Sequence, residues 1–135
     1  METLPPQGQP VTALGAMPDD VLIVEDDAII AMDFEEAILG LGVQAVRTAA
    51  NVNEALAMIA ERTPHFALLD VGLGSETSLV VADRLVELGV PFALVTGYRA
   101  DLALFSRFAH RPILSKPYAM DDLQTVLRNW SVPRP

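Results

Sequence analysis

The stretch VLIVEDD, residues 21–27, decides the fold, because it joins an apolar strand directly to a cluster of acids. Residues 21–24 are an unbroken apolar run with β-branched side chains, which is typical of a parallel strand buried on both faces. Glu25, Asp26 and Asp27 follow where that strand ends. Open parallel sheets bind their ligands at the carboxyl ends of the strands, so these acids indicate a functional site.

Strand and helix signals alternate along the rest of the chain. Apolar runs predict further strands at 43–48, 66–69, 92–95 and 113–115, and helical spacing predicts helices near 30–41, 52–59, 79–88, 101–108 and 120–130. Asp27 is interpreted as the N-cap of the first helix, Asn51 with Glu54 as a capping box, and Met120 and Trp130 as core contacts of the last helix. The predicted fold class is therefore α/β, a doubly wound (βα)5 flavodoxin-like three-layer sandwich with a five-stranded parallel sheet.

The 135 residues are enough for one domain. Four prolines in residues 1–18 predict a flexible N-terminal tail, followed by a domain at 19–131 and a short C-terminal tail at 132–135. The net charge of −9 disfavours nucleic-acid binding, and the absence of cysteine excludes disulfides and thiolate metal sites. No apolar run approaches the roughly 18 residues of a membrane span, so we expect a cytoplasmic protein.

Chemically useful side chains follow four of the five predicted strands. Glu25 and Asp26 follow the first strand, Asp70 the third, Thr96 the fourth and Lys116 the fifth. Carboxylates gathered at one edge repel one another and require a cation, and a set of oxygen ligands without His or Cys suits Mg²⁺. A hard dication beside a carboxylate and an ammonium is typical of phosphoryl transfer, with the carboxylate as nucleophile.

Four motifs in this order resemble the receiver domain of two-component response regulators over roughly residues 19–131. They are VLIVEDD at 21–27, LLDVGLG at 68–74, Thr96-Gly97 and Lys116-Pro117. The resemblance implies that Asp70 is the phosphoacceptor and forms an aspartyl phosphate. It also implies Mg²⁺, with Mn²⁺ as a substitute, held by Asp26 and Asp70 directly, by Glu25 mainly through water, and by the backbone carbonyl of Gly72.

The resemblance also implies roles around the metal. Lys116 pairs with Asp70 and then with the phosphoryl oxygens, Thr96 reports the phosphoryl group, and Pro117 follows a cis peptide bond. Residues 91–98, PFALVTGY, are similar to the signature of a stand-alone subgroup with a Phe-Ala-Thr-Gly-Tyr motif, although Leu94-Val95 replace its Phe-Ala pair. Most receivers carry an aromatic residue where this chain has Ile113, so Tyr98 is the candidate partner of Thr96 in a switch.

The expected function is that of a single-domain response regulator, not an enzyme. It would be phosphorylated by a histidine kinase or a histidine phosphotransfer protein and would signal through contacts with a downstream protein, as a monomer or weak homodimer. Three alternatives stay open: a phosphate sink, a partner-binding receiver without phosphorylation, and a haloacid-dehalogenase-like phosphatase with an aspartate nucleophile. The last needs a second Asp two residues after the first, where this chain has Gly72.

Overall fold

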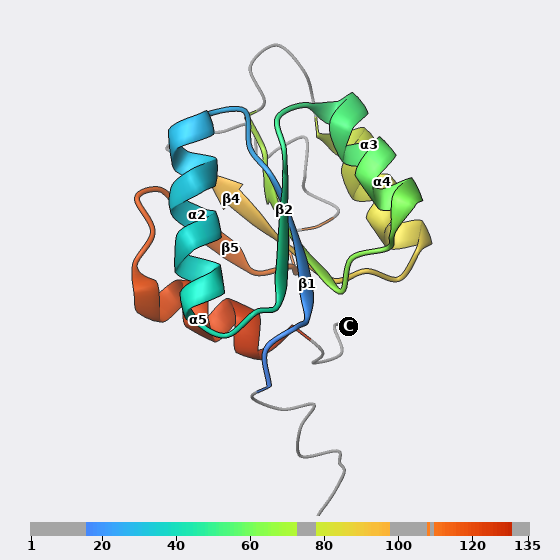
Figure 1. The fold of residues 1–135 in the computed structure, drawn as a ribbon. Coiled ribbons are helices and arrows are strands. Elements are labelled where there is room, and N and C mark those ends of the chain that lie inside the picture. Colours follow the sequence, from blue (N-terminus) through green and yellow to red (C-terminus); the bar gives the residue numbers. More distant parts are fainter. Residues whose placement is uncertain (1–15, 73–77, 98–107, 109, 131–135) are drawn as a thin grey trace, which may run out of the picture.

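The computed structural model describes residues 16–72, 78–97, 108 and 110–130. This part of the chain forms a single parallel sheet with helices on both of its faces (Figure 1). The strands are β1 (Asp20–Val24), β2 (Ala45–Ala49), β3 (Phe66–Asp70), β4 (Phe92–Thr96) and β5 (Ile113–Ser115), and the helices are α2 (Ala28–Gly40), α3 (Val52–Glu61), α4 (Leu79–Glu87) and α5 (Met120–Arg128). The strand order is β2-β1-β3-β4-β5, which confirms the predicted fold class.

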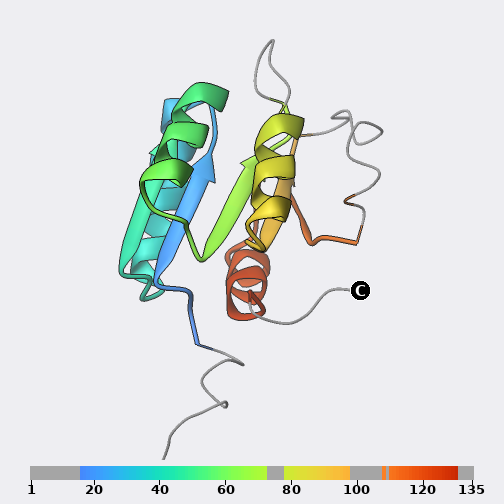
Figure 2. The same cartoon turned by 90° about the vertical axis from the view of Figure 1, so that its right-hand side faces the viewer.

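The helices divide between the two faces of the sheet, with α2 and α5 on one side and α3 and α4 on the other (Figures 1 and 2). Alternate residues of β1 supply the two hydrophobic cores. Val21 and Ile23 pack in the core under α2 and α5, whereas Leu22 and Val24 pack in the core under α3 and α4. A strand between two helical layers must be apolar at every position, which explains the unbroken run at residues 21–24.

Side-chain caps start the first two described helices, as the sequence predicts. The Asp27 carboxylate accepts hydrogen bonds from the backbone N–H groups of Ile29 and Ile30. Asn51 accepts the N–H of Glu54 at 2.8 Å, and the Glu54 carboxylate in turn accepts the N–H of Ala50 at 2.8 Å. The bonds from Ile29, Ile30 and Glu54 satisfy N–H groups that the first helical turn leaves without partners, and the bond from Ala50 ties the residue before the cap to α3.

Some expectations are wrong or fall outside the described residues. Met120 is 47% exposed, so its assignment to the core is wrong: it is the first residue of α5, and the described residues leave nearly half of its surface uncovered. Trp130 does pack against the core, and its indole N–H donates to the carbonyl of Ala16 at 3.1 Å. Residues 1–15 of the predicted tail and most of the helix predicted at 101–108 lie outside the described residues.

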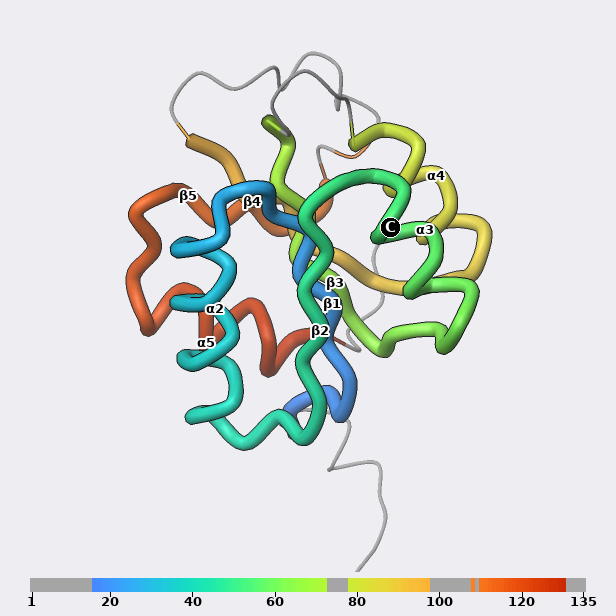
Figure 3. Tube along the Cα trace, turned by 45° about the horizontal axis from the view of Figure 1, so that its top comes forward, coloured from blue at the N-terminus to red at the C-terminus, as the bar shows by residue number. Residues whose placement is uncertain are grey.

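The parallel register brings the functional candidates to one edge. Val24 is paired with Leu69, Asp70 with Val95, and Thr96 with Ser115. The residues at or just past these strand ends therefore lie side by side at the carboxyl edge of the sheet, seen at the upper side of Figure 3. Among the described residues, no helix is both long and apolar enough to cross a bilayer.

At the other end of the sheet, where the strands begin, a buried carboxylate forms ion pairs with two arginines. Asp20, at the start of β1, is 3.2 Å from Arg47 Nη2 and 2.6 Å from Arg62 Nε. The Arg47 guanidinium also donates to the backbone carbonyls of Met58 and Arg62, so it joins β2 to the end of α3. A buried carboxylate with two guanidinium partners is well compensated, and loss of its charge would leave Arg47 with an unpaired charge.

We expect Asp20→Asn to destabilise the domain by about 2–4 kcal/mol, because it breaks a largely buried ion pair. Urea unfolding at neutral pH measures the change. Glu87→Gln is the matched control, since its ion pair with Arg84 is exposed and should contribute less than about 0.5 kcal/mol. Equal effects of the two variants would contradict this account of the Asp20 cluster.

Candidate functional site

Three carboxylates meet at the carboxyl edge of the sheet. Oxygens of Glu25, Asp26 and Asp70 all lie within 4.8 Å of one another. Glu25 and Asp70 are only 3% and 4% exposed, whereas Asp26 is exposed. Buried carboxylates at this separation repel strongly, so the cluster favours a cation among its members.

The single lysine of the chain supplies positive charge to this cluster. Lys116 Nζ lies 2.9 Å from Glu25 Oε1 and 3.5 Å from Asp70 Oδ2. Glu25 Oε1 accepts no other hydrogen bond among the described residues, so this ion pair is its main compensation. Burial lowers the pKa of Lys116, but the hydrogen bond to Glu25 and the attraction of both carboxylates outweigh it, and the pKa is raised.

Within the cluster, Glu25 is the carboxyl whose charged form is disfavoured by its surroundings. Desolvation by burial raises the pKa of Glu25 to about 7, against the lowering effects of Lys116 and of the Asp27 N–H, which donates to Glu25 Oε2 at 3.1 Å. The negative charge of Asp70 adds to the rise. A carboxyl that is half protonated near neutral pH is a poorly satisfied anion, and an added dication would restore its charge.

Backbone contacts fix the orientation of Asp70. The N–H of Gly72 donates to Asp70 Oδ1 at 3.1 Å, so the other oxygen, Oδ2, is the one that faces the ammonium. The fully buried hydroxyl of Ser78 donates to the backbone carbonyl of Asp70 at 2.9 Å. Sequence reasoning missed Ser78, although a serine directly before a helical stretch was visible; its hydroxyl bonds to β3 instead of capping α4.

Thr96 ends β4 beside this cluster and is buried. Its hydroxyl donates to the carbonyl of Gly97 at 2.6 Å. The peptide bond between Lys116 and Pro117 is cis, which matches the prediction for Pro117. Tyr98, the predicted partner of Thr96, lies outside the described residues.

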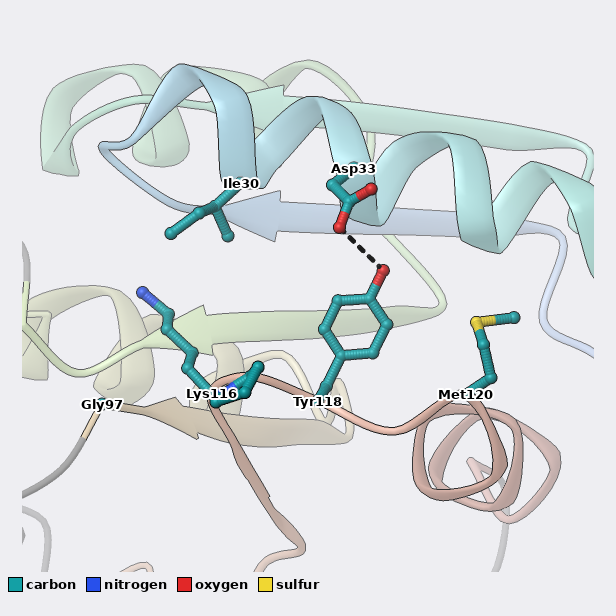
Figure 4. A pocket seen from close by; sticks show the side chains of 7 residues that line it. Ile30, Asp33, Gly97, Lys116, Tyr118 and Met120 are labelled. Carbon is teal, nitrogen blue, oxygen red and sulfur yellow. Dashed lines mark hydrogen bonds between the residues drawn. The ribbon is translucent and has the colours of Figure 1, made fainter.

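A pocket of about 680 Å³ lies beside Lys116, between the start of α2 and the segment that joins β5 to α5 (Figure 4). Its largely apolar lining comes from Ile30, Asp33, Gly97, Lys116, Pro117, Tyr118 and Met120. The Tyr118 hydroxyl donates to Asp33 at 3.4 Å, and burial together with that carboxylate raises the pKa of Tyr118. Sequence reasoning missed both residues, although Tyr118 directly follows the Lys-Pro motif.

Comparison with known proteins identifies the family. The model of the response regulator receiver domain matches residues 21–128. The chain belongs to this family.

The receiver is 30% identical over 114 residues to the phyllosphere-induced regulator PhyR of Methylorubrum extorquens, a match that covers 82% of this chain and 43% of PhyR. It is 29% identical over 119 residues to the transcriptional regulatory protein PdtaR of Mycobacterium tuberculosis, covering 86% of this chain and 58% of PdtaR. The chain thus spans about half the length of these curated relatives.

A solved structure of similar size also resembles this receiver. The solution structure of SdrG from Sphingomonas melonis is 38% identical, with a TM-score of 0.75, and the match covers 89% of this chain and 98% of SdrG. A second solution structure, of the BeF3-activated conformation of SdrG, is 36% identical with a TM-score of 0.71. The fold of this chain is therefore that of receiver domains.

The raised pKa of Glu25 predicts how the stability of the metal-free receiver depends on pH. Between the pKa of an unfolded glutamate and about 7, the folded state binds more protons than the unfolded state, so stability falls as pH rises. Glu25→Gln removes this titration, so the stability of the variant relative to that of wild type should rise as the pH increases from 5 to 8.

Urea unfolding in the presence of EDTA at several pH values measures the difference. Glu61→Gln, at an exposed position of α3, is the control and should follow the wild-type pH profile. Parallel profiles for Glu25→Gln and wild type would show that Glu25 is not held near neutrality by burial.

Proposed function

We propose that this receiver accepts a phosphoryl group on Asp70 from the phosphohistidine of a histidine kinase or histidine phosphotransfer protein. The observation that carries the proposal is the placement of the sole lysine. Its ammonium contacts both buried carboxylates, and one of them, Asp70, ends a central strand with an oxygen directed at that ammonium. An attacking carboxylate beside a fixed positive charge suits the transfer of an anionic group.

Asp70 Oδ2 is the atom we assign to the attack. The Gly72 N–H restrains Oδ1, and Lys116 lies beside Oδ2, where the charge of an incoming phosphoryl group would be neutralised. The oxygen–phosphorus bond to Asp70 forms as the phosphorus–nitrogen bond of the donor breaks. The donor imidazole leaves with the electron pair of that bond and takes up a proton.

The donor set fits Mg²⁺, with Mn²⁺ as a substitute. Glu25, Asp26, Asp70 and the backbone carbonyl of Gly72 would hold the ion, and all of these are oxygen ligands. When bound, the ion would neutralise the oxygens of the transferring group. The raised pKa of Glu25 supports this assignment, because a carboxyl that burial pushes toward neutrality gains from a nearby dication.

We further propose that the output is a contact with a downstream protein in the cytoplasm. The Thr96 hydroxyl would leave the Gly97 carbonyl to bond the phosphoryl oxygens of the aspartyl phosphate. Tyr98 stays the candidate for the second part of this switch. The chemistry of this receiver would be limited to accepting and losing the phosphoryl group.

Asp70→Asn should abolish phosphorylation, because an amide oxygen is a far weaker nucleophile than a carboxylate. Intact-protein mass spectrometry after incubation with acetyl phosphate and Mg²⁺ measures the adduct. Asp27→Asn is a matched control, since Asn also caps helices well and the residue caps α2. An adduct of equal yield on Asp70→Asn would contradict the assignment, and so would its loss in Asp27→Asn.

Asp26→Asn should weaken Mg²⁺ binding by at least about tenfold, because it removes a charged ligand and leaves a neutral amide oxygen. Isothermal titration calorimetry of the apo-protein measures the affinity. Glu36→Gln is a suitable control, since Glu36 is exposed on α2 and is not part of the carboxylate cluster. Unchanged affinity in Asp26→Asn would place the metal elsewhere.

A further inference from the structure

We propose that Tyr118 is a positioning residue for Lys116: its ring, stacked on Phe34, holds the segment that carries the lysine against the helix that begins at the acid cluster. This inference rests on the proposed phosphoryl transfer to Asp70. It concerns a residue for which sequence reasoning assigned no role.

The two rings form a close stack across the interface between α2 and the segment before α5. Their centroids are 4.5 Å apart and their planes are inclined by 15°. Phe34 is 1% exposed and belongs to the core under α2 and α5, so it offers a fixed surface to the Tyr118 ring. The hydroxyl reaches the neighbouring Asp33 on the same helix, and Figure 4 shows this bond as the dashed line.

The contact is close to Lys116 along the chain. Only Pro117 separates the two residues, and the pyrrolidine ring fixes one backbone dihedral of that link. A ring held at position 118 therefore limits where the backbone at position 116 lies. The backbone N–H of Lys116 donates to the carbonyl of Thr96 at 2.8 Å, which provides the other restraint.

Lys116 needs such restraints because its strand gives it little support. β5 has only three residues, lies at the edge of the sheet, and ends at Ser115. The lysine side chain is flexible and 22% exposed, so its two ion pairs order the ammonium only if the backbone is already in place.

The stack connects the two partners of the central ion pair. α2 begins at its cap Asp27, directly after Glu25 and Asp26, and carries Phe34 two turns further along. Tyr118 rests on Phe34, and Lys116 contacts Glu25. The acid cluster and the lysine are thus held in register by one aromatic contact outside the cluster itself, and displacement of a charged group by about 1 Å is enough to slow a reaction severely.

The ring and the hydroxyl of Tyr118 are expected to differ in how much each restrains Lys116. The hydroxyl bond to Asp33 is 3.4 Å long and lies on an exposed face, whereas the ring stacks on a buried partner. We therefore expect the ring to be essential and the hydroxyl to be dispensable.

The test uses substitutions that separate these parts. Tyr118→Leu removes the stack, and Tyr118→Phe and Asp33→Asn keep it. Tyr118→Met, which also lacks a ring but is more adaptable, replaces Leu if that variant does not fold. Trp130→Leu is the matched control, because Trp130 packs on the same core at the far end of α5, away from Lys116.

Initial phosphorylation rates with acetyl phosphate and saturating Mg²⁺ are the first measurement. Tyr118→Leu should be slower than wild type by about tenfold to a hundredfold, while Tyr118→Phe, Asp33→Asn and Trp130→Leu stay within about threefold. Mg²⁺ affinity should be unchanged or tighter in Tyr118→Leu, since a displaced ammonium competes less with the metal. General loosening of the fold would weaken Mg²⁺ binding instead.

Because Lys116 is the sole lysine, its signal is unique in a lysine-labelled sample, and NMR relaxation at its ε-carbon measures its order without metal or phosphodonor. The order parameter should fall in Tyr118→Leu and remain near the wild-type value in Tyr118→Phe. In a Lys116→Ala background, Tyr118→Leu should change neither the phosphorylation rate nor the Mg²⁺ affinity further.

The outcomes separate this inference from the proposed function. Absence of an adduct on wild type would overturn the phosphoryl transfer to Asp70, and the order of Lys116 would still test the link to Tyr118. Wild-type order and wild-type rate in Tyr118→Leu would overturn the inference, and so would additive effects in the Lys116→Ala background or equal losses in Tyr118→Leu and Tyr118→Phe.

Discussion

The site depends on one electrostatic constraint: two buried carboxylates at the end of the sheet share a single ammonium. Glu25 and Asp70 are almost fully removed from solvent, and Lys116 lies within 3.5 Å of both. With Asp26 added, three acids face one base, so the cluster retains surplus negative charge. Burial makes that surplus costly, and desolvation accordingly raises the pKa of Glu25. Because acids outnumber bases in this cluster, binding of a cation would stabilise it.

The arrangement of these charges follows from the parallel register of the sheet and was predictable from the sequence. Glu25, Asp70, Thr96 and Lys116 each stand at or just after an apolar run, and the ends of parallel strands meet at one edge. The caps Asp27 and Asn51 were predictable as well, because each acts within three residues of itself. Strand ends and helix caps can be recognised from neighbouring residues alone, and the parallel sheet then places the residues at the strand ends close together.

The contacts that sequence reasoning missed are those that depend on packing between distant residues. Tyr118 and Asp33 are 85 positions apart, and Asp20 lies 27 and 42 positions from its two arginines. Periodicity predicts that α2 and the last helix are amphipathic, but it does not specify which side chains touch across the interface. Ser78 was missed for a related reason: its hydroxyl is buried and donates to the backbone carbonyl of Asp70, eight positions earlier in the chain, instead of capping α4.

The two ends of the sheet show how the same chemistry serves different purposes. At the amino edge, Asp20 is compensated by two guanidinium groups, and the local charge is satisfied within the fold. At the carboxyl edge the ratio is reversed, since three carboxylates share one ammonium. Stability alone would favour the first arrangement at both ends, because compensated buried charges cost less than uncompensated ones. The excess of acids at the carboxyl ends of the strands therefore lowers the stability of the fold. Parallel α/β folds bind their ligands at these strand ends, and residues that reduce stability locally are expected at functional sites.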